Sequence, residues 1–136
     1  MPNQTVYQTR LERILGAPLA DDAVRQWPQS GERIDGRARI GEVEGHFVGL
    51  RLGVGRRHLL GDTVVVEWST DYGDGRLYRN VSIAELHDGK AIRVTDYWGE
   101  PFEPPAWREE LADSLEMPAD GAWPPAEALR GDNDAP

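Results

Sequence analysis

The stretch that decides the fold is KAIRVTDYW, residues 90–98. Successive side chains of a β-strand point to opposite sides of the sheet, so a strand here places Ile92, Val94, Asp96 and Trp98 on one face. That face is apolar except for Asp96. A carboxylate in such surroundings must be paired, neutral or functional, because burying an unpaired charge is costly. The stretch therefore predicts a strand with one polar site on its apolar face.

Three further strands are predicted upstream of this one. Their ranges are about 50–60, 63–71 and about 77–86, with turn residues between them at Gly61-Asp62, Gly73-Asp74-Gly75 and Asp88-Gly89. Glycine tolerates the positive φ angles that tight hairpin turns need. Strands that follow one another at this short spacing predict an antiparallel meander.

The N-terminal part predicts helices instead. Apolar residues at helical spacing indicate a helix over 5–15, and Gly16-Ala17-Pro18 ends it. We expect a short strand over 21–27, a loop over 28–33 and a second helix over 36–47. The predicted fold class is therefore α+β, with a curved antiparallel sheet of about four to five strands packed on N-terminal helices.

The C-terminal part predicts little regular structure. Pro101, Pro104 and Pro105 end the sheet, and Trp107, Leu111 and Leu115 predict a short helix. Residues 118–136 mix Pro, Ala, Gly and Asp, which predicts a mobile tail. We expect a single domain over residues 1–117.

Composition excludes several classes of function. The chain has 136 residues and a formal charge of -9, from 24 acidic and 15 basic residues, which disfavours nucleic acid as a partner. It has no cysteine, so it has no disulfide and no thiol chemistry. We found no polybasic patch and no run of apolar residues long enough to span a membrane. We therefore expect a cytoplasmic protein that binds neither nucleic acid nor membrane.

Several short motifs resemble a known family. They are WPQSGERIDGR at 27–37, VVEW at 65–68, YGDG at 72–75, NVSI at 80–83 and DYW at 96–98. In order and spacing they resemble the SnoaL-like branch of the nuclear transport factor 2 (NTF2-like) superfamily. The resemblance implies a cone of curved sheet and helices, a homodimer, and a largely apolar pocket for a small organic molecule. Related members include ketosteroid isomerases, polyketide cyclases and limonene-epoxide hydrolases.

Two departures from the family pattern affect this interpretation. The helical region before the first strand is shorter than is usual in the family. The epoxide hydrolases also use an Arg and a second Asp beside the carboxylate that matches Asp96, and the corresponding positions here are Trp68 and Thr70. The sequence therefore predicts that the Asp-Arg-Asp relay is absent, which argues against epoxide hydrolysis.

Asp96 is the candidate acid or base, because burial among apolar groups shifts a carboxyl group toward the range where proton transfer is efficient. The alternative is a structural Asp that is paired with an Arg or with the backbone. Tyr72 and His46 are candidate hydroxyl and imidazole partners. The predicted pocket-lining residues are Trp27, Val66, Trp68, Thr70, Ile92, Val94 and Trp98.

We expect neither a metal nor a cofactor. His46, His58 and His87 do not show ligand spacing with a carboxylate, and the glycine-containing runs do not lie between a strand and a helix. The predicted function is binding of a small apolar organic molecule, with acid/base proton transfer of the isomerase, cyclase or hydrolase type. The alternative is a non-catalytic ligand-binding or dimerisation module.

Overall fold

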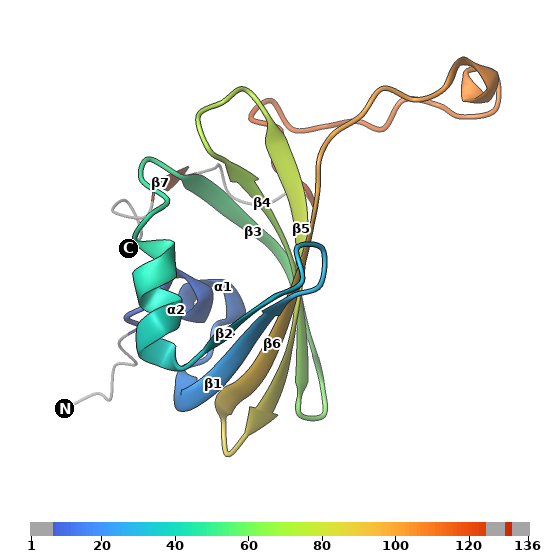
Figure 1. Cartoon of the computed structure of the whole chain (residues 1–136). Helices are drawn as coiled ribbons and strands as arrows, with labels where there is room; N and C mark the ends of the chain where they lie inside the picture. The colour runs from blue at the N-terminus through green and yellow to red at the C-terminus, as the bar shows by residue number, and fades with distance from the viewer. Residues whose placement is uncertain (1–6, 125–129, 132–136) are drawn as a thin grey trace.

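The computed structural model describes residues 7–124 and 130–131. Two helices and a curved sheet make up the body of the molecule (Figure 1). The elements in chain order are α1 (Arg10–Leu15), β1 (Leu19–Trp27), β2 (Glu32–Asp35), α2 (Arg37–Glu44), β3 (Arg51–Leu60), β4 (Thr63–Asp71), β5 (Leu77–His87), β6 (Lys90–Gly99), the single 3₁₀ turn η1 (Ala106–Arg108) and β7 (Arg130–Gly131).

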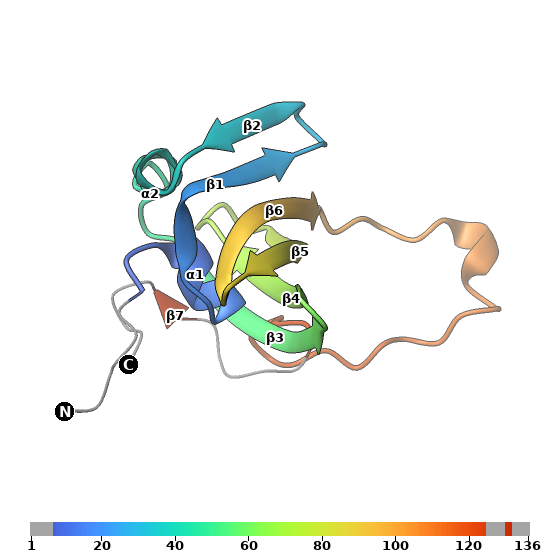
Figure 2. The ribbon, with the colours of Figure 1, turned by 90° about the horizontal axis from the view of Figure 1, so that it is seen from below.

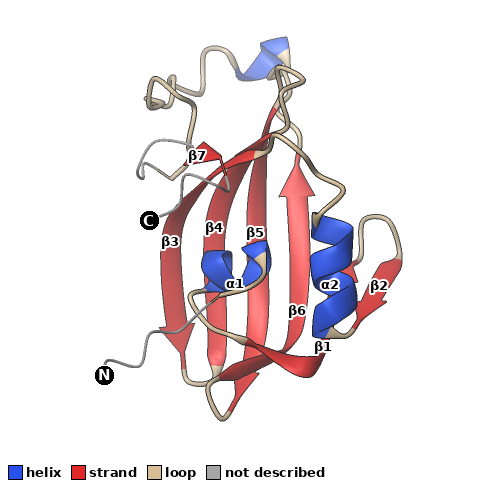
Figure 3. Ribbon diagram, turned by 90° about the vertical axis from the view of Figure 1, so that its left-hand side faces the viewer, coloured by secondary structure: helices blue, strands red, loops and turns tan. Residues whose placement is uncertain are grey.

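The sheet has the strand order β2-β1-β6-β5-β4-β3-β7. Strands β3 to β6 form the predicted antiparallel meander, and β1 joins its β6 edge in parallel. Both helices lie over one face of the sheet, which we call the inner face (Figure 3). The expected α+β cone is confirmed, although two strands were not predicted, namely β2 and the two-residue β7.

Local sequence explains where α1 begins and ends. Thr9 and Glu12 form a capping box, in which each side chain bonds to the backbone N–H of the other residue. Gly16 then ends the helix with a φ of 71°, a conformation that glycine adopts without a steric penalty. The described helix is shorter than the predicted one, and residues 1–6 lie outside the described residues.

The core lies between α1 and the inner face. Leu11 and Ile14 of α1 are fully buried and share one apolar cluster with Val66 of β4, Ala84 of β5 and Val94 of β6. Burial of this apolar surface holds the short helices on the sheet. None of the helices in the described part of the chain is long and apolar enough to cross a membrane.

The alternation predicted for residues 90–98 fails at one point. The register between β5 and β6 shifts where Glu85 pairs with Arg93 but Leu86 pairs with Ala91. This β-bulge lets Ala91 and Val94 both face the core, and it turns Ile92 outward to 38% exposure. The prediction that Ile92 shares a face with Asp96 was wrong for this reason.

Two other segments differ from the predictions. Residues 32–35, of which the first two fell in a predicted loop, form β2, which pairs with β1 as a hairpin. The predicted helix around Trp107, Leu111 and Leu115 is only η1, and all three side chains are more than 60% exposed. A helix without an apolar surface to cover gains little from tertiary packing, which is where most helical stability arises.

Part of the predicted C-terminal tail lies against the outer face of the sheet, which is the face opposite the helices. Ala122 and Pro124 are buried, and the backbone N–H of Trp123 donates to Ser69 Oγ over 2.9 Å. Strand β7 pairs with Arg51 and Leu52 of β3. The domain limit at residue 117 stays a prediction, and residues 125–129 and 132–136 of the tail lie outside the described residues.

Candidate functional site

A cavity of about 440 Å³ opens at the end of the sheet that α2 covers. Seven aromatic residues border it, contributed by β1, β4, β5, β6 and two loops: Trp27, Phe47, Trp68, Tyr72, Tyr78, Tyr97 and Trp98. Trp27 and Trp98 meet edge to face with their ring centroids 5.7 Å apart, and Tyr72 and Tyr78 do so at 5.3 Å. Such a wall suits a flat apolar ligand.

Asp96 lies in the wall of this cavity and is 2% exposed. Its Oδ2 accepts hydrogen bonds from the Arg25 guanidinium and, over 2.8 Å, from the Trp27 indole N–H. Its Oδ1 accepts a hydrogen bond from the Ser82 hydroxyl. All three donors are side chains, and each of the two carboxylate oxygens has at least one, which is the arrangement that stabilises an ionised carboxylate.

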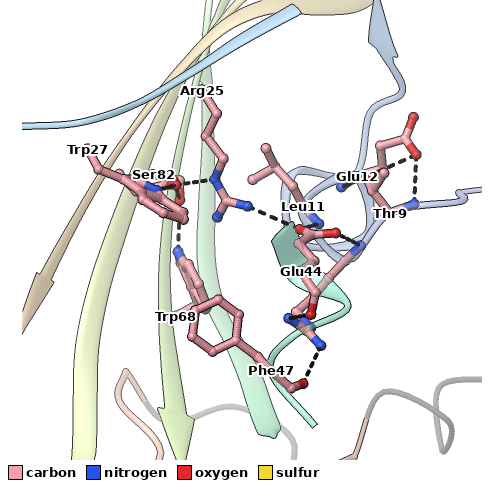
Figure 4. Close-up of polar contacts among 11 residues, drawn as sticks. Thr9, Leu11, Glu12, Arg25, Trp27, Glu44, Phe47, Trp68 and Ser82 are labelled. Atoms are coloured by element: carbon pink, nitrogen blue, oxygen red, sulfur yellow. Dashed lines mark hydrogen bonds and ion pairs between the residues drawn. The ribbon is translucent and has the colours of Figure 1, made fainter. Parts of the chain in front are cut away.

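Arg25 connects Asp96 to a second buried carboxylate, Glu44 of α2. The two side chains form an ion pair with a nitrogen–oxygen distance of 3.1 Å. Glu44 also accepts the backbone N–H groups of Arg10 and Leu11, at 2.8 and 2.9 Å. Figure 4 shows Arg25 between the strand residues on one side and Leu11 and Glu44 on the other. The relay Glu44–Arg25–Asp96 therefore ties β1, β6 and both helices together.

Ser82 extends this polar cluster to the neighbouring strand. It lies opposite Asp96 in the register of β5 and β6, and its hydroxyl oxygen accepts the Trp68 indole N–H over 2.9 Å. Figure 4 shows the contact between Trp68 and Ser82. The Ser82 hydroxyl therefore accepts a hydrogen bond from Trp68 and donates one to Asp96. Two of the aromatic rings in the cavity wall, Trp27 and Trp68, are consequently fixed by the polar cluster.

The structure brings together part of the predicted site. Asp96, Tyr72, Trp27, Trp68 and Trp98 all line the cavity. His46 does not, since it follows α2 as an exposed residue outside the cavity wall.

Four predicted lining residues lie elsewhere. Val66 and Val94 are fully buried in the core under α1, further along their strands than the cavity. Thr70 is buried and accepts a hydrogen bond from Asn80 Nδ2 over 3.0 Å, and Ile92 is turned outward by the bulge. None of the four is among the cavity-lining residues, because strand parity fixes a face but not a position along the strand.

The sequence did not identify Arg25, Glu44, Ser82 or Asn80 as members of the site. The pattern of β1 offers one signal, because Arg25 lies two residues before Trp27 and so shares its face. Glu44 lies on a different element, and no local pattern links it to Asp96. The epoxide-hydrolase relay was expected to be absent because Trp68 and Thr70 occupy its positions, and the structure has an acid–Arg–acid relay of different origin, with residues from β1, α2 and β6.

Among the described residues, no group of three or more His, Asp or Glu side chains is arranged to hold a metal ion. Asn80 Oδ1 is the one buried side-chain oxygen or nitrogen among the described residues without a hydrogen-bond partner.

Comparisons with known proteins give matches among solved structures. No protein-family model matches the chain, and no curated protein does so. An NTF2-like protein of unknown function from Burkholderia xenovorans is 35% identical, with a TM-score of 0.64, and the match covers 72% of this chain and 77% of that one. A protein from Kribbella flavida, provisionally described as a ketosteroid isomerase, is 34% identical, with a TM-score of 0.65 and coverage of 82% and 76%. TerC, crystallised with polyporic acid, is 25% identical, with a TM-score of 0.51 and coverage of 60% and 73%.

The first two of these structures combine more than 30% identity with coverage of about three quarters of their own length. They share the architecture of curved sheet and covering helices described above. The chain belongs to the NTF2-like superfamily.

Proposed function

We propose that this protein binds a small, mostly apolar organic molecule in the aromatic cavity and transfers a proton to or from it through Asp96. The observation that supports the proposal best is a buried carboxylate in the wall of a cavity bordered by seven aromatic residues. A volume of about 440 Å³ falls within the range that small-molecule sites occupy. Structures similar to this chain include the protein provisionally described as a ketosteroid isomerase and TerC crystallised with polyporic acid.

The relay supports a role for Asp96 in proton transfer. Arg25 and Glu44 hold the carboxylate in one orientation, and preorganised groups lose little energy to rearrangement during a reaction. A proton taken from the ligand would reside on Asp96, and the Ser82 hydroxyl can rotate to accept a hydrogen bond from it. Tyr72, which lines the same cavity, is the candidate hydroxyl partner.

A second candidate function is non-catalytic binding. One observation favours it: Asp96 already accepts three hydrogen bonds from protein side chains, so both of its oxygens are engaged within the cavity wall. In this alternative the carboxylate serves to fix Trp27, Arg25 and Ser82, and the ligand is held without being changed.

The experiment that separates the two candidates uses NMR in D₂O with a panel of ketosteroids, epoxides and polyketide-like ketones. The enzyme proposal expects deuterium exchange or product formation, reduced about 100-fold or more in Asp96→Asn. The control is Asp62→Asn, since Asp62 is an exposed carboxylate in the turn between β3 and β4, outside the cavity wall. It should retain activity.

A ligand that binds beside the tryptophans of the cavity but undergoes neither deuterium exchange nor conversion to product would favour the non-catalytic candidate. Equal activity in wild type and Asp96→Asn would remove Asp96 from the mechanism. If no member of the panel binds, the proposed ligand class is wrong.

We further propose that the chain is a cytoplasmic homodimer of the SnoaL-like branch. The motifs at 27–37 and 96–98 support the branch. The outer face of the sheet supports the dimer, because Ile83 and Tyr97 are exposed there at 38% and 44%. Light scattering at micromolar concentration tests the dimer, and a monomer would contradict it.

A further inference from the structure

Negative charges outnumber positive ones in the wall of the aromatic cavity. Five carboxylates line it, against the two guanidinium groups of Arg10 and Arg25. Three of the five, Glu32, Asp74 and Glu100, are exposed. Because these three side chains both line the cavity and contact solvent, they lie where the cavity opens, and we call them the acidic rim.

The positive groups of the wall already have acceptors within the protein. Arg25 lies between two buried carboxylates, those of Glu44 and Asp96. Arg10 donates to the backbone carbonyl oxygens of Glu44 and Phe47, at 3.3 and 3.2 Å. Both guanidinium groups are therefore held inside the wall and not at the acidic rim.

One further guanidinium lies beside the acidic rim. Arg76 pairs with Glu100 at a nitrogen–oxygen distance of 3.4 Å, while Asp74 accepts only the backbone N–H of Arg76. No described residue forms an ion pair with Glu32. Even with Arg76 counted, five carboxylates against three guanidinium groups leave a net formal charge of −2 at the cavity. Such a field attracts cations and repels anions.

Aromatic rings lie next to these carboxylates. Phe47 and Tyr72 have their ring centroids 5.7 Å apart, and Tyr72 and Tyr78 have theirs 5.3 Å apart. The Tyr78 hydroxyl donates to Glu100 over 3.3 Å. Phe47 and Tyr72 are 42% and 39% exposed, so both side chains have uncovered surface in the cavity wall. A positive group at this place can contact an aromatic ring and lie near a carboxylate at the same time.

The cavity wall already contains one contact of this kind. The Arg25 guanidinium lies 5.4 Å from the centroid of the Trp27 ring. The face of an aromatic ring carries negative potential, so it attracts a cation within about 6 Å of its centroid. The remaining rings of the wall offer the same attraction to a cation that enters from outside.

The segment that follows Glu100 does not cover the acidic rim. Figures 1 and 2 show residues 100–117 extending from the end of β6, away from the side of the sheet that α1 and α2 cover. A ligand can therefore reach the cavity without displacing this segment.

We propose that the cavity selects apolar molecules that carry an alkylated ammonium group, which is held between the aromatic rings and the acidic rim. This inference rests on the proposed binding of a small, mostly apolar molecule in the same cavity. Alkyl groups on the nitrogen suit the site, because they pack on aromatic rings and leave few N–H donors to satisfy. Asp96, the carboxylate deeper in the wall, already accepts three protein donors.

The test compares three probes of similar shape and different charge. They are benzyltrimethylammonium, neopentylbenzene, in which carbon replaces the nitrogen, and phenylacetate. Tryptophan fluorescence and calorimetry give their affinities for the full chain. Wild type should bind the cation about tenfold more tightly than neopentylbenzene, and the anion most weakly.

A double variant, Glu32→Gln with Asp74→Asn, tests the acidic rim. It removes two exposed charges and should weaken binding of the cation about fivefold, with the affinity for neopentylbenzene unchanged. The matched control is Asp62→Asn with Asp88→Asn, which removes two exposed charges from turns outside the cavity wall. The control should bind all three probes as wild type does, and thermal melting checks that both proteins are folded.

Tyr72→Leu tests the aromatic part of the site. Leucine keeps an apolar side chain but has no ring face, so the preference for the cation over neopentylbenzene should fall about threefold.

Equal affinity of wild type for the cation and neopentylbenzene would overturn the selection of cations and leave the proposed binding of an apolar molecule intact. A preference for the cation that persists unchanged in both the rim variant and Tyr72→Leu would overturn the assigned site. Absence of binding by all three probes would overturn both this inference and the proposed ligand class.

Discussion

Glu12 and Asp96 are two buried carboxylates that serve different purposes. Glu12 accepts the backbone N–H groups of Gln8, Thr9 and Leu19, at 2.8 to 3.0 Å, and both of its oxygens accept Arg37. Asp96 accepts side-chain donors and lines the cavity, whereas Glu12 does not. Burial of a charge therefore does not by itself mark a functional site, and the kind of donor and access to a cavity distinguish the two.

The pKa of Glu12 agrees with a structural role. Burial acts to raise it, but the backbone hydrogen bonds from Leu19 and Thr9, the Thr9 hydroxyl and the charge of Arg37 together outweigh burial, so the pKa lies below its ordinary value of 4.5. A carboxylate whose pKa is lowered by folding stabilises the folded state at pH values above its ordinary pKa. That contribution is lost as the pH falls through the pKa of the folded state.

The largest effect is expected for Glu12→Gln. The variant leaves Arg37 without a counter-ion and presses an amide NH₂ group against backbone N–H donors, so it should lower the free energy of unfolding by about 3–5 kcal/mol. Chemical denaturation measures the change. Glu42→Gln, an exposed position on α2, is the control and should stay within about 0.5 kcal/mol of wild type.

The pH dependence of the same variant sharpens the comparison. Wild type should lose stability as the pH falls below about 4.5, and the stability difference between wild type and Glu12→Gln should narrow over that range. Denaturation curves between pH 6 and pH 3 (a range set about the ordinary glutamate pKa) give this difference. A difference that is constant with pH would show that Glu12 contributes through packing alone.

Asp96→Asn should lower the free energy of unfolding by about 1–2 kcal/mol, which is less than Glu12→Gln does. The amide oxygen can still accept a hydrogen bond, and Arg25 keeps its ion pair with Glu44. Denaturation beside Glu12→Gln checks the order. A loss as large as that of Glu12→Gln would mean that Asp96 is as structural as Glu12, and the comparison would fail.

Ser82→Ala should lower the free energy of unfolding by about 1 kcal/mol, since it removes the hydroxyl that links Trp68 to Asp96. A double-mutant cycle with Asp96→Asn measures their coupling, which should exceed about 0.5 kcal/mol. Additive effects would show that the two side chains act independently.

The smallest effect is expected on the outer face. Arg56→Ala removes an exposed ion pair with Glu67 and should change stability by less than about 0.5 kcal/mol. The same denaturation assay applies, and a larger loss would indicate that this face is buried in solution, as in a dimer.

The sequence predicted the elements whose patterns are local. Strand β4 was predicted at its observed limits, and β3, β5 and β6 were predicted to within a few residues, because alternation and glycine turns encode them directly. Helix α2 was also predicted to within a few residues, from apolar residues at helical spacing. Ile92 was misplaced because a β-bulge depends on the pairing of two strands and leaves no mark on either one alone. The C-terminal helix was overpredicted because apolar spacing indicates a surface but not whether anything covers it.

For the site, the sequence by itself determined that one carboxylate, Asp96, interrupts an apolar strand face and that aromatic residues accompany it. Only the tertiary structure decided what that carboxylate contacts. Arg25, Glu44 and Ser82 lie 71, 52 and 14 residues from Asp96 along the chain, and the parallel pairing of β1 with β6, the packing of α2 and the register of β5 bring them together. Side-chain pairing across elements depends on the fold as a whole, so no local pattern can specify it.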